Sequence, residues 1–379
     1  MIVLFYLLGV FCIYSYFIYP LILQLIPSRQ FDFAGSLPAD DEWPMLSLII
    51  TVHNEAARIR EKLENTLLID YPAASLEIII ASDFSTDATE DIVQAYADKG
   101  VKLVRADERK GKEYAQLCGI RASHGEILVF SDVATMIPDD ALKHLVLRFA
   151  DNRIGAISSE DRFLSQDGSI AGEGAYVKYE MWLRRQESGR AGLVGLSGSF
   201  FAARRQLCEH WDIYCPSDFN TALNTAKSGM VAITCPDVIG EYRDVQDASL
   251  EYDRKMRTVI RGITAIARHP EVLSPLRMGL FAFQVWSHKI MRWGVPWFML
   301  GFAIVTLWLQ GKGVIYSLAL YAQLLFYTLA LAGWLIAGLR KNTLIKIIFF
   351  FVQTNIALAQ ATLQFLMGKR MTVWAPSKR

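Results

Sequence analysis

Three acidic residues stand where short apolar runs of the chain end, and they are the first candidates for chemistry. Glu55 closely follows the run 46–52, Asp83 follows 76–82, and Asp132 follows 126–131. Runs of this length, rich in β-branched residues, are typical of buried strands in a parallel sheet. Ligands bind at the carboxyl ends of strands in such sheets. Carboxylates repeated at that edge therefore favour a site for a cationic or metal-bound ligand, as in an enzyme.

Polar turns beside these strand ends add further candidates. Ser85, Thr86 and Asp87 are good capping residues for the helix expected from Ala88, and capping alone accounts for them. The basic turn 109–112 offers Lys112, which can pair with a diphosphate as a mobile point charge. An ordinary charged surface turn is the other explanation for that cluster.

Asp132 is the candidate ligand for a divalent metal. Mg²⁺ and Mn²⁺ are hard cations, which carboxylates bind together with substrate phosphates. A metal at this position would act as a Lewis acid and neutralise charge on a departing diphosphate.

The elements that position these residues form one α/β domain, expected over residues 43–270, in which strands alternate with helices. The formal net charge of +1 over 379 residues gives no argument for a nucleic-acid partner. The five cysteines show no C-x-x-C pair and no metal-like spacing. They fit reduced, buried thiols in a cytoplasmic domain.

Apolar segments flank this domain and predict transmembrane helices at both ends of the chain. Residues 1–28 form a retained spanning helix rather than a signal peptide, because no basic residue precedes Arg29. Residues 294–367 hold about three further spans, followed by a basic tail at 368–379. Between domain and spans, residues 271–293 mix aromatic, aliphatic and basic side chains, which favours a helix in the membrane interface.

The positive-inside rule places the amino terminus outside and the domain in the cytoplasm. Arg340, Lys341 and Lys346 mark the turn between the last two spans as cytoplasmic too. Three spans after the domain would leave the basic tail outside. Either the segment after Pro296 is re-entrant or interfacial, or the tail departs from the rule. We expect an integral protein of a bacterial inner (plasma) membrane.

Taken together, the motifs resemble the inverting family 2 glycosyltransferases of the GT-A fold, relatives of cellulose, hyaluronan and ceramide glycosyltransferases. The resemblance covers nearly the whole chain. The matching segments, in order, are Asn54-Glu55, 82–87, Gly111-Lys112, Asp132, 179–188, 195–204, 217–219 and 254–258. It implies a Rossmann-like mixed sheet flanked by helices.

The resemblance also implies a role for each matched residue. Asp218 is the base that deprotonates the acceptor hydroxyl, and Asp132 binds Mg²⁺ or Mn²⁺. Gly198 belongs to a segment that approaches the donor sugar. The remaining donor-binding residues are Glu55 and Asp83 at the uridine, Lys112 near the diphosphate, and Arg254 and Arg257 as a diphosphate clamp.

The chain departs from the family pattern at three places, one of which is Ser217, in the position of the acid that precedes Asp218. Val133-Ala134 follows Asp132, so the second acid of the D-x-D motif is missing. The metal then rests on Asp132 and the diphosphate alone, or on another residue such as Asp161 or His288. The Q-x-x-R-W signature keeps Arg257 but has Thr258 in place of the tryptophan, which weakens a polymerase interpretation.

The leading hypothesis is therefore transfer of one sugar from a UDP-sugar to a lipid-linked or glycolipid acceptor. It serves glycolipid or extracellular polysaccharide assembly. A processive polysaccharide synthase with synthase or export partner proteins is the first alternative. A catalytically degenerate donor-binding subunit is the second, although a subunit that only binds the donor has no need of Asp218.

Overall fold

The computed structural model describes residues 1–34, 36–39, 42–164, 175–243 and 248–371. The chain divides into two compact units. One is an α/β unit of residues 26–246, 264–283 and the tail. The other is an apolar helical unit of residues 1–25, 247–263 and 284–370. Each unit is described by itself.

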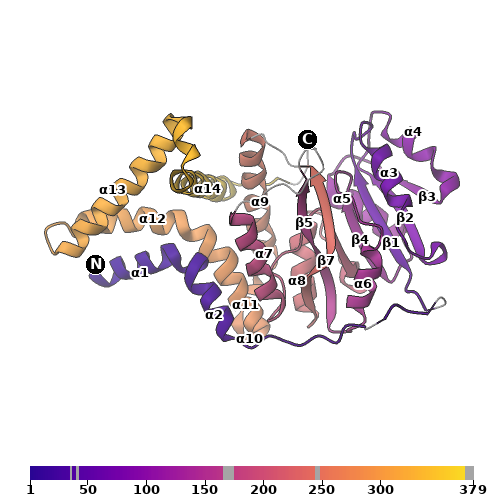
Figure 1. Ribbon diagram of the computed structural model, residues 1–379, viewed down its shortest axis with the longest axis horizontal. Coiled ribbons are helices and arrows are strands. Elements are labelled where there is room, and N and C mark those ends of the chain that lie inside the picture. Colours follow the sequence, from indigo (N-terminus) through magenta and orange to yellow (C-terminus); the bar gives the residue numbers. More distant parts are fainter. Residues whose placement is uncertain (35, 40–41, 165–174, 244–247, 372–379) are drawn as a thin grey trace. The chain divides into compact units, whose positions relative to one another are not determined.

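In the part of the chain that the structure describes, the α/β unit is built on one sheet of seven strands in the order β3-β2-β1-β4-β6-β5-β7 (Figure 1). The strands are β1 (Leu46–Val52), β2 (Leu76–Ser82), β3 (Val101–Arg105), β4 (Ile127–Asp132), β5 (Ile154–Leu164), β6 (Phe200–Arg204) and β7 (Val231–Arg243). The three predicted acid-tipped strands are β1, β2 and β4, and they lie side by side with β1 in the middle.

The register brings the predicted site residues to one edge of the sheet. Strands β1 to β4 are parallel, with Val52 opposite Ser82 and Thr51 opposite Asp132. Strand β6 runs antiparallel to β4, so its first residue, Phe200, pairs with Ser131 near the carboxyl end of β4. The segment just before β6, which includes Gly198, therefore meets Asp132.

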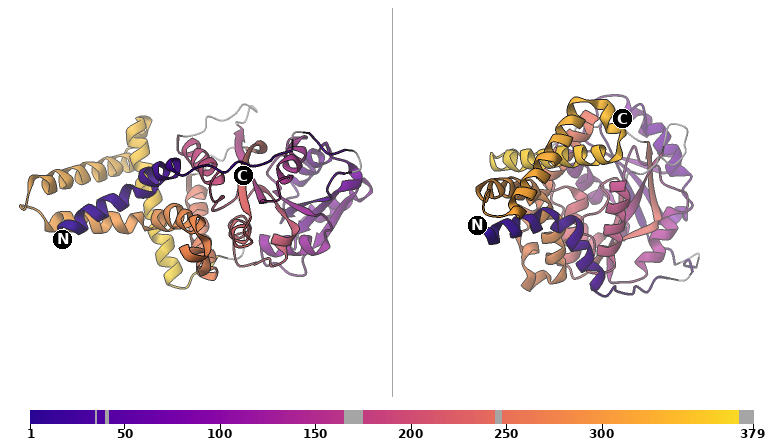
Figure 2. Two further views of the ribbon diagram at one scale, coloured as in Figure 1. Left: turned by 90° about the horizontal axis from the view of Figure 1, so that it is seen from below. Right: turned by 60° about the vertical axis from the view of Figure 1, so that its left-hand side comes forward.

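Helices cover both faces of the sheet, as the two views in Figure 2 show. One apolar core lies under α3 (Ile59–Leu67), α4 (Thr89–Gln94) and α6 (Ala141–Phe149). The other lies under α5 (Lys112–Ala122) and α8 (Ser217–Lys227). Successive strand residues alternate between the two cores, so that Leu48 and Ile50 face the first and Ile49 faces the second. Both faces are buried, which explains the continuous apolar runs.

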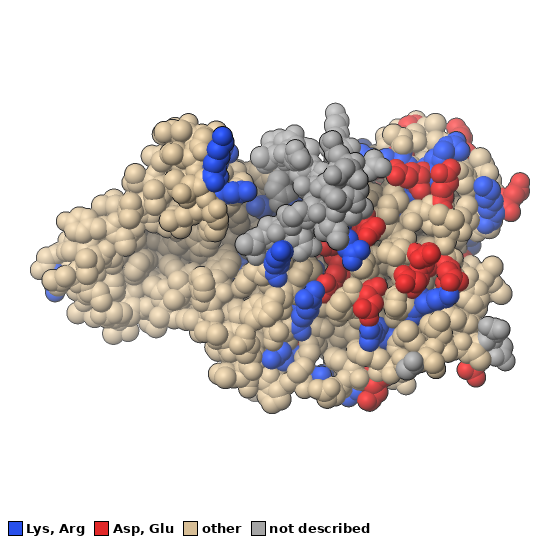
Figure 3. Space-filling model, viewed as in Figure 1, with Lys and Arg blue, Asp and Glu red and all other residues tan. Residues whose placement is uncertain are grey.

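Two further helices contribute to the α/β unit. Helix α7 (Ala175–Ser188) precedes the segment before β6, and α9 (Ala248–Arg268) contributes to both units. On the face drawn in Figure 3, the charged side chains gather mainly over the α/β unit.

Among the described residues, four helices are long and apolar enough to cross a membrane, which confirms the expected apolar helices at both ends of the chain. They span Ile2–Leu25, Leu280–Trp308, Val314–Leu335 and Thr343–Leu366. The first consists of α1 (Ile2–Ile13), a π-helical turn and α2 (Tyr19–Leu25), and the last two are α13 and α14.

The boundary predicted at residues 293 and 294 falls inside a helix. Residues 271–293 form two short helical turns, a break at Gly279 with a φ of +53°, and then the start of the long helix 280–308. That helix runs through α11 (Leu280–Val285), a π-helical turn at Trp286–Ile290 and α12 (Met291–Trp308). The break occurs at Gly279 because glycine tolerates a positive φ. The interfacial location of this region stays a prediction.

Candidate active site

Hydrogen bonds join the first two strand-end loops into one structure. Asn54 accepts the Thr86 amide on Oδ1 at 2.8 Å, and its own amide donates to Ser85 Oγ at 3.1 Å. Asp87 Oδ2 accepts the Ala56 amide at 3.1 Å. Sequence reasoning assigned Ser85–Asp87 to capping alone. The structure adds a second role, in which these residues fix the loop that carries Glu55.

Glu55 is buried within that loop. Its amide donates to Thr89 Oγ1 at 2.8 Å, and its carboxylate lies 3.7 Å from the guanidinium of Arg58. The residue therefore reaches the expected edge of the sheet, where its contact with a donor stays a prediction.

The carboxylate of Asp83 is held by backbone amides. Its Oδ1 accepts the backbone amides of Gly111 at 3.0 Å and Lys110 at 3.1 Å, which ties the end of β2 to the basic turn. Gly111 can serve this turn because its φ of +102° is unfavourable for residues with a side chain. Burial raises the pKa of Asp83, and the two amides act in the opposite direction. Its Oδ2 is buried and has no hydrogen-bond partner among the described residues.

Lys112 connects the third strand end to the segment before β6. Its Nζ donates to Asp132 Oδ1 at 2.5 Å and to the carbonyl oxygen of Gly198 at 2.7 Å. The Asp132 amide in turn donates to the carbonyl of Ser199 at 2.9 Å. The predicted diphosphate lysine, metal ligand and sugar-contacting glycine therefore lie together.

Asp218 approaches this group from the first turn of α8. A Cβ added to Gly198 would lie only 3.1 Å from Asp218 Oδ2, so the carboxylate sits directly against the glycine backbone. The carbonyl of Asp218 accepts the Leu196 amide at 3.3 Å. A carboxylate held beside a close backbone approach is an arrangement that can accept a proton from a bound hydroxyl.

Asp161, which the sequence offered only as an alternative metal ligand, belongs to the same neighbourhood. Its Oδ1 accepts the hydroxyl of Ser197 at 2.6 Å, and the Ser199 hydroxyl lies at 3.4 Å. These two serines flank Gly198. Asp161 therefore orients the segment that carries the close approach to Asp218.

Lys62 is a buried residue of the site that sequence reasoning missed. Its Nζ donates to Ser131 Oγ at 2.9 Å and to the carbonyl of Thr135 at 2.5 Å, on either side of Asp132. Burial lowers the pKa of Lys62 to about 7, and the Asp132 carboxylate acts in the opposite direction. Its place in the sequence held a signal, because Ile59 and Thr66, three and four residues away, put Lys62 on the buried face of α3.

A divalent metal fits the site with Asp132 as its single protein carboxylate. The side chain is 34% exposed, and only its Oδ1 is engaged by Lys112. Mg²⁺ needs no more than one or two carboxylates where substrate phosphates complete its shell. His288, the other alternative ligand, lies on the π-helical turn of the helical unit, where its Nε2 is 3.2 Å from Arg292 Nη1.

Arg254 and Arg257 lie on α9, in the part that belongs to the helical unit. The other predicted donor-binding residues belong to the α/β unit. A diphosphate clamp by these two arginines therefore stays a prediction.

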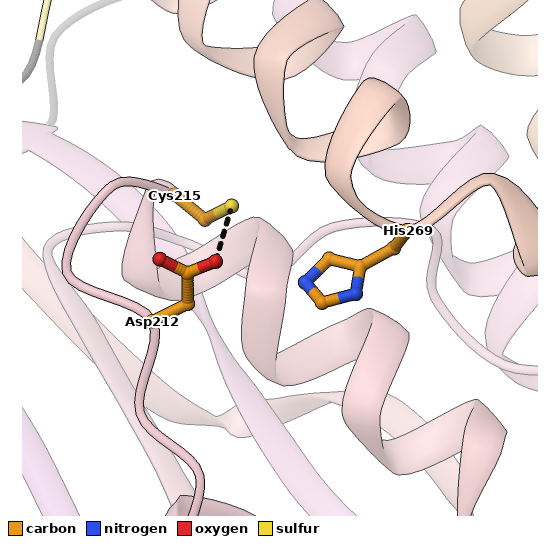
Figure 4. Close-up of side chains that lie close together, drawn as sticks. All are labelled: Asp212, Cys215 and His269. Atoms are coloured by element: carbon orange, nitrogen blue, oxygen red, sulfur yellow. Dashed lines mark hydrogen bonds between the residues drawn. The ribbon is translucent and has the colours of Figure 1, made fainter.

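A second group of potential metal ligands lies elsewhere in the α/β unit. Asp212, Cys215 and His269 are the one set among the described residues whose three ligand atoms fall within 4.8 Å of one another (Figure 4). Arg268 Nε already binds Asp212 Oδ2 at 2.6 Å, and Lys227 Nζ lies 3.2 Å from His269 Nδ1. Burial raises the pKa of Cys215 to about 12, which keeps the thiol protonated. These contacts explain why the three side chains lie close together without a metal ion.

Comparison with known proteins shows a likeness to glycosyltransferases. The model of the family Glycosyl transferase family 2 matches residues 47–211, which contain every predicted site residue except Asp218, Arg254 and Arg257. The beta-monoglucosyldiacylglycerol synthase of Nostoc sp. is 28% identical over 193 residues, 48% of this chain and 40% of that protein. The poly-beta-1,6-N-acetyl-D-glucosamine synthase of Staphylococcus epidermidis is 26% identical over 175 residues, 44% of this chain and 42% of that protein. The chain thus spans less than half the length of these curated relatives.

Among solved structures, the mannosyltransferase PcManGT from Pyrobaculum calidifontis, in complex with GDP-Man and Mn²⁺, shares the fold. The TM-score is 0.74 at 23% identity, over 97% of this chain and 99% of that one. The mixed sheet, its flanking helices and this likeness define a GT-A fold, as the sequence predicted. Residues 47–211, which hold β1 to β6, are the part of the chain that resembles the Glycosyl transferase family 2.

Proposed function

We propose that the chain is a membrane-integral, inverting glycosyltransferase that moves one sugar from a nucleotide donor, expected to be a UDP-sugar, to a lipid-linked or glycolipid acceptor. The observation that supports it best is the convergence of Lys112, Asp132 and Asp218 around the backbone of Gly198. The chain places a cation, a candidate metal ligand and a candidate base around one small volume.

The proposed reaction is a single displacement. The acceptor hydroxyl oxygen forms a bond to the anomeric carbon while the bond from that carbon to the diphosphate oxygen breaks. Asp218 takes the hydroxyl proton, and the nucleoside diphosphate leaves with the bonding electron pair on the opposite face. A bound divalent metal would supply Lewis-acid charge at the diphosphate. Lys112 adds a positive charge at the same place.

The four apolar helices support an acceptor in the membrane. One relative's name describes a glycolipid synthase and another's a polysaccharide synthase, so the relatives leave both products open. Single transfer is favoured because Thr258 replaces the tryptophan expected for a processive enzyme. We place the α/β unit in the cytoplasm of a bacterial cell, at the inner membrane.

The test uses the full chain reconstituted in nanodiscs, with a panel of UDP- and GDP-sugars, membrane-lipid acceptors and Mn²⁺. We expect release of nucleoside diphosphate together with a monoglycosylated lipid. Asp218→Asn should lower turnover by about 10²- to 10⁴-fold, because a positioned base contributes that much. Asp237→Asn, which breaks a surface ion pair with Arg148, is the matched control and should keep full activity.

Three results would redirect the proposal. Long polymeric products would establish the processive alternative. Turnover insensitive to Asp218→Asn would remove the base from the mechanism. Donor binding without any turnover would favour the donor-binding subunit.

A further inference from the structure

Backbone strain in the described chain concentrates at the edge of the sheet where the donor is expected. Asn54 and Phe84 are the two non-glycine residues with positive φ among the described residues, at +53° and +56°. Asparagine visits this region routinely, and here its Oδ1 is held by the Thr86 amide at 2.8 Å. Phenylalanine does not, so a bulky residue at this φ is a genuine outlier. Strained residues of this kind cluster at ligand sites.

The ring of Phe84 is held in place on one side and exposed to solvent. The guanidinium carbon of Arg105 lies 4.4 Å from the ring centroid, a distance typical of a cation–π contact. Arg105 is itself held by Glu90 at 3.4 Å, and Glu90 accepts the Ser82 hydroxyl at 2.6 Å. The residue remains 37% exposed. Single exposed aromatic residues are common, but they do not normally require a strained backbone.

Phe84 follows Asp83 directly in the chain. Asp83 carries a buried carboxylate oxygen, Oδ2, with no hydrogen-bond partner among the described residues. An acceptor of this kind suits a donor group on a base edge or a ribose hydroxyl. An aromatic ring next to it adds the second contact that nucleotide sites use, because any nucleobase can stack on an aromatic face.

We propose that the ring of Phe84, supported by Arg105, is the surface on which the nucleobase of the donor stacks. This inference rests on the proposed function, since it requires a nucleotide donor at Asp83. Contact with the base would explain why the chain keeps a bulky residue at a φ of +56°. The contact acts on binding and leaves the transfer step itself unchanged.

The experiment measures the Kd of UDP, and separately of pyrophosphate, for the full chain by calorimetry with Mn²⁺ present. Phe84→Ala removes the ring and keeps the strain, Phe84→Gly removes both, and Phe84→Trp keeps an aromatic face. We expect Ala and Gly to weaken UDP binding about tenfold, which corresponds to about 1.4 kcal/mol. Trp should stay within about threefold of the natural protein. Pyrophosphate, which has no base, should bind equally to all four proteins.

Thermal unfolding and a matched control separate this role from a structural one. Phe84→Gly should unfold at a temperature no lower than Phe84→Ala, because glycine relieves the positive φ. Phe33→Ala removes another exposed ring, 39% exposed, over which Arg148 lies at 4.3 Å, and should leave UDP binding unchanged.

The outcomes distinguish this inference from the proposed function. Natural protein that binds no nucleoside diphosphate would refute the proposed function, and the inference with it. Tight UDP binding that Phe84→Ala leaves unchanged would overturn the inference alone. So would an equal loss of pyrophosphate affinity, because the ring would then act on something other than the base.

Discussion

Replacing Gly198 by alanine tests whether the backbone of this segment sets the position of the base. The added Cβ would lie 3.1 Å from Asp218 Oδ2 and 3.5 Å from its Cγ. The first distance is tighter than ordinary contacts, so the carboxylate must retreat by a few tenths of an ångström. Asp218 can retreat because a short side chain rotates more easily than the backbone shifts.

The size of the effect follows from how catalysis depends on geometry. Misplacement of about 1 Å costs roughly 10²-fold in rate, so a few tenths of an ångström should cost about tenfold in kcat. That loss corresponds to about 1.4 kcal/mol of activation free energy. The Kd of UDP should stay unchanged, because the Gly198 carbonyl still accepts from Lys112. The melting temperature should also stay within a few degrees. The φ of Gly198 is not positive, so alanine can adopt the same backbone conformation. Alanine lowers the conformational entropy of the unfolded chain, which stabilises the fold by about 0.4–1 kcal/mol and offsets the cost of the new contact.

The assay combines steady-state turnover, UDP calorimetry and thermal unfolding. Gly338→Ala is the control, since no atom lies within 4 Å of the Cβ it would add. Adding Gly198→Ala to Asp218→Asn should cause no further loss, because both changes act through one carboxylate. An additive loss in the double variant would refute the reasoning. A raised donor KM with unchanged kcat would instead show that the glycine serves the donor sugar directly.

Three further predictions concern other charged groups. Because burial raises the pKa of Asp83, its carboxylate protonates at a higher pH than an ordinary aspartate; UDP affinity should fall accordingly as pH decreases, and calorimetry on Asp83→Asn should show a flat, weak profile. Lys112→Met removes the contacts to Asp132 and Gly198 and should weaken pyrophosphate binding by about tenfold or more, since a hydrogen bond to a charged group is worth about 1.5–3 kcal/mol. Arg153 holds the pKa of Asp151 well below its ordinary value, so Asp151→Asn should lower the free energy of unfolding by about 1–3 kcal/mol at pH 7. Chemical denaturation should show that difference shrinking below the ordinary Asp pKa of about 3.9, as acid protonates the natural carboxylate.

The parts of the fold that the sequence predicted are those set by local pattern. Apolar runs buried on both faces predicted β1, β2 and β4, and the acidic residue at or near the end of each run marked the edge where the candidate site lies. Family motifs added Asp218, which no periodicity could connect to that edge. The apolar helices followed from length and composition, which decide whether a segment suits a membrane.

The parts that the sequence missed depend on contacts between distant residues. Lys62 is charged, and a charged residue on a helix is normally assigned to solvent. Its burial depends on two acceptors, Ser131 and Thr135, that lie about seventy residues later. The hydrogen bond between Asn54 and the turn at 85–87 likewise depends on the parallel register of β1 and β2. That register brings together two loops that a capping argument treats separately.

The missing second acid after Asp132 gains a physical explanation from these contacts. Val133 is buried in the core shared by α3 and α6, so the turn runs inward directly after the strand. Lys62 holds that turn at Ser131 and Thr135, and Lys112 holds the Asp132 carboxylate from the other side. One carboxylate paired with the ammonium group of Lys112 makes the site less negative than a pair of acids would. We therefore expect a donor diphosphate at this site to meet the charge of Lys112, and a metal to supply a smaller share of the neutralisation than in a two-acid site.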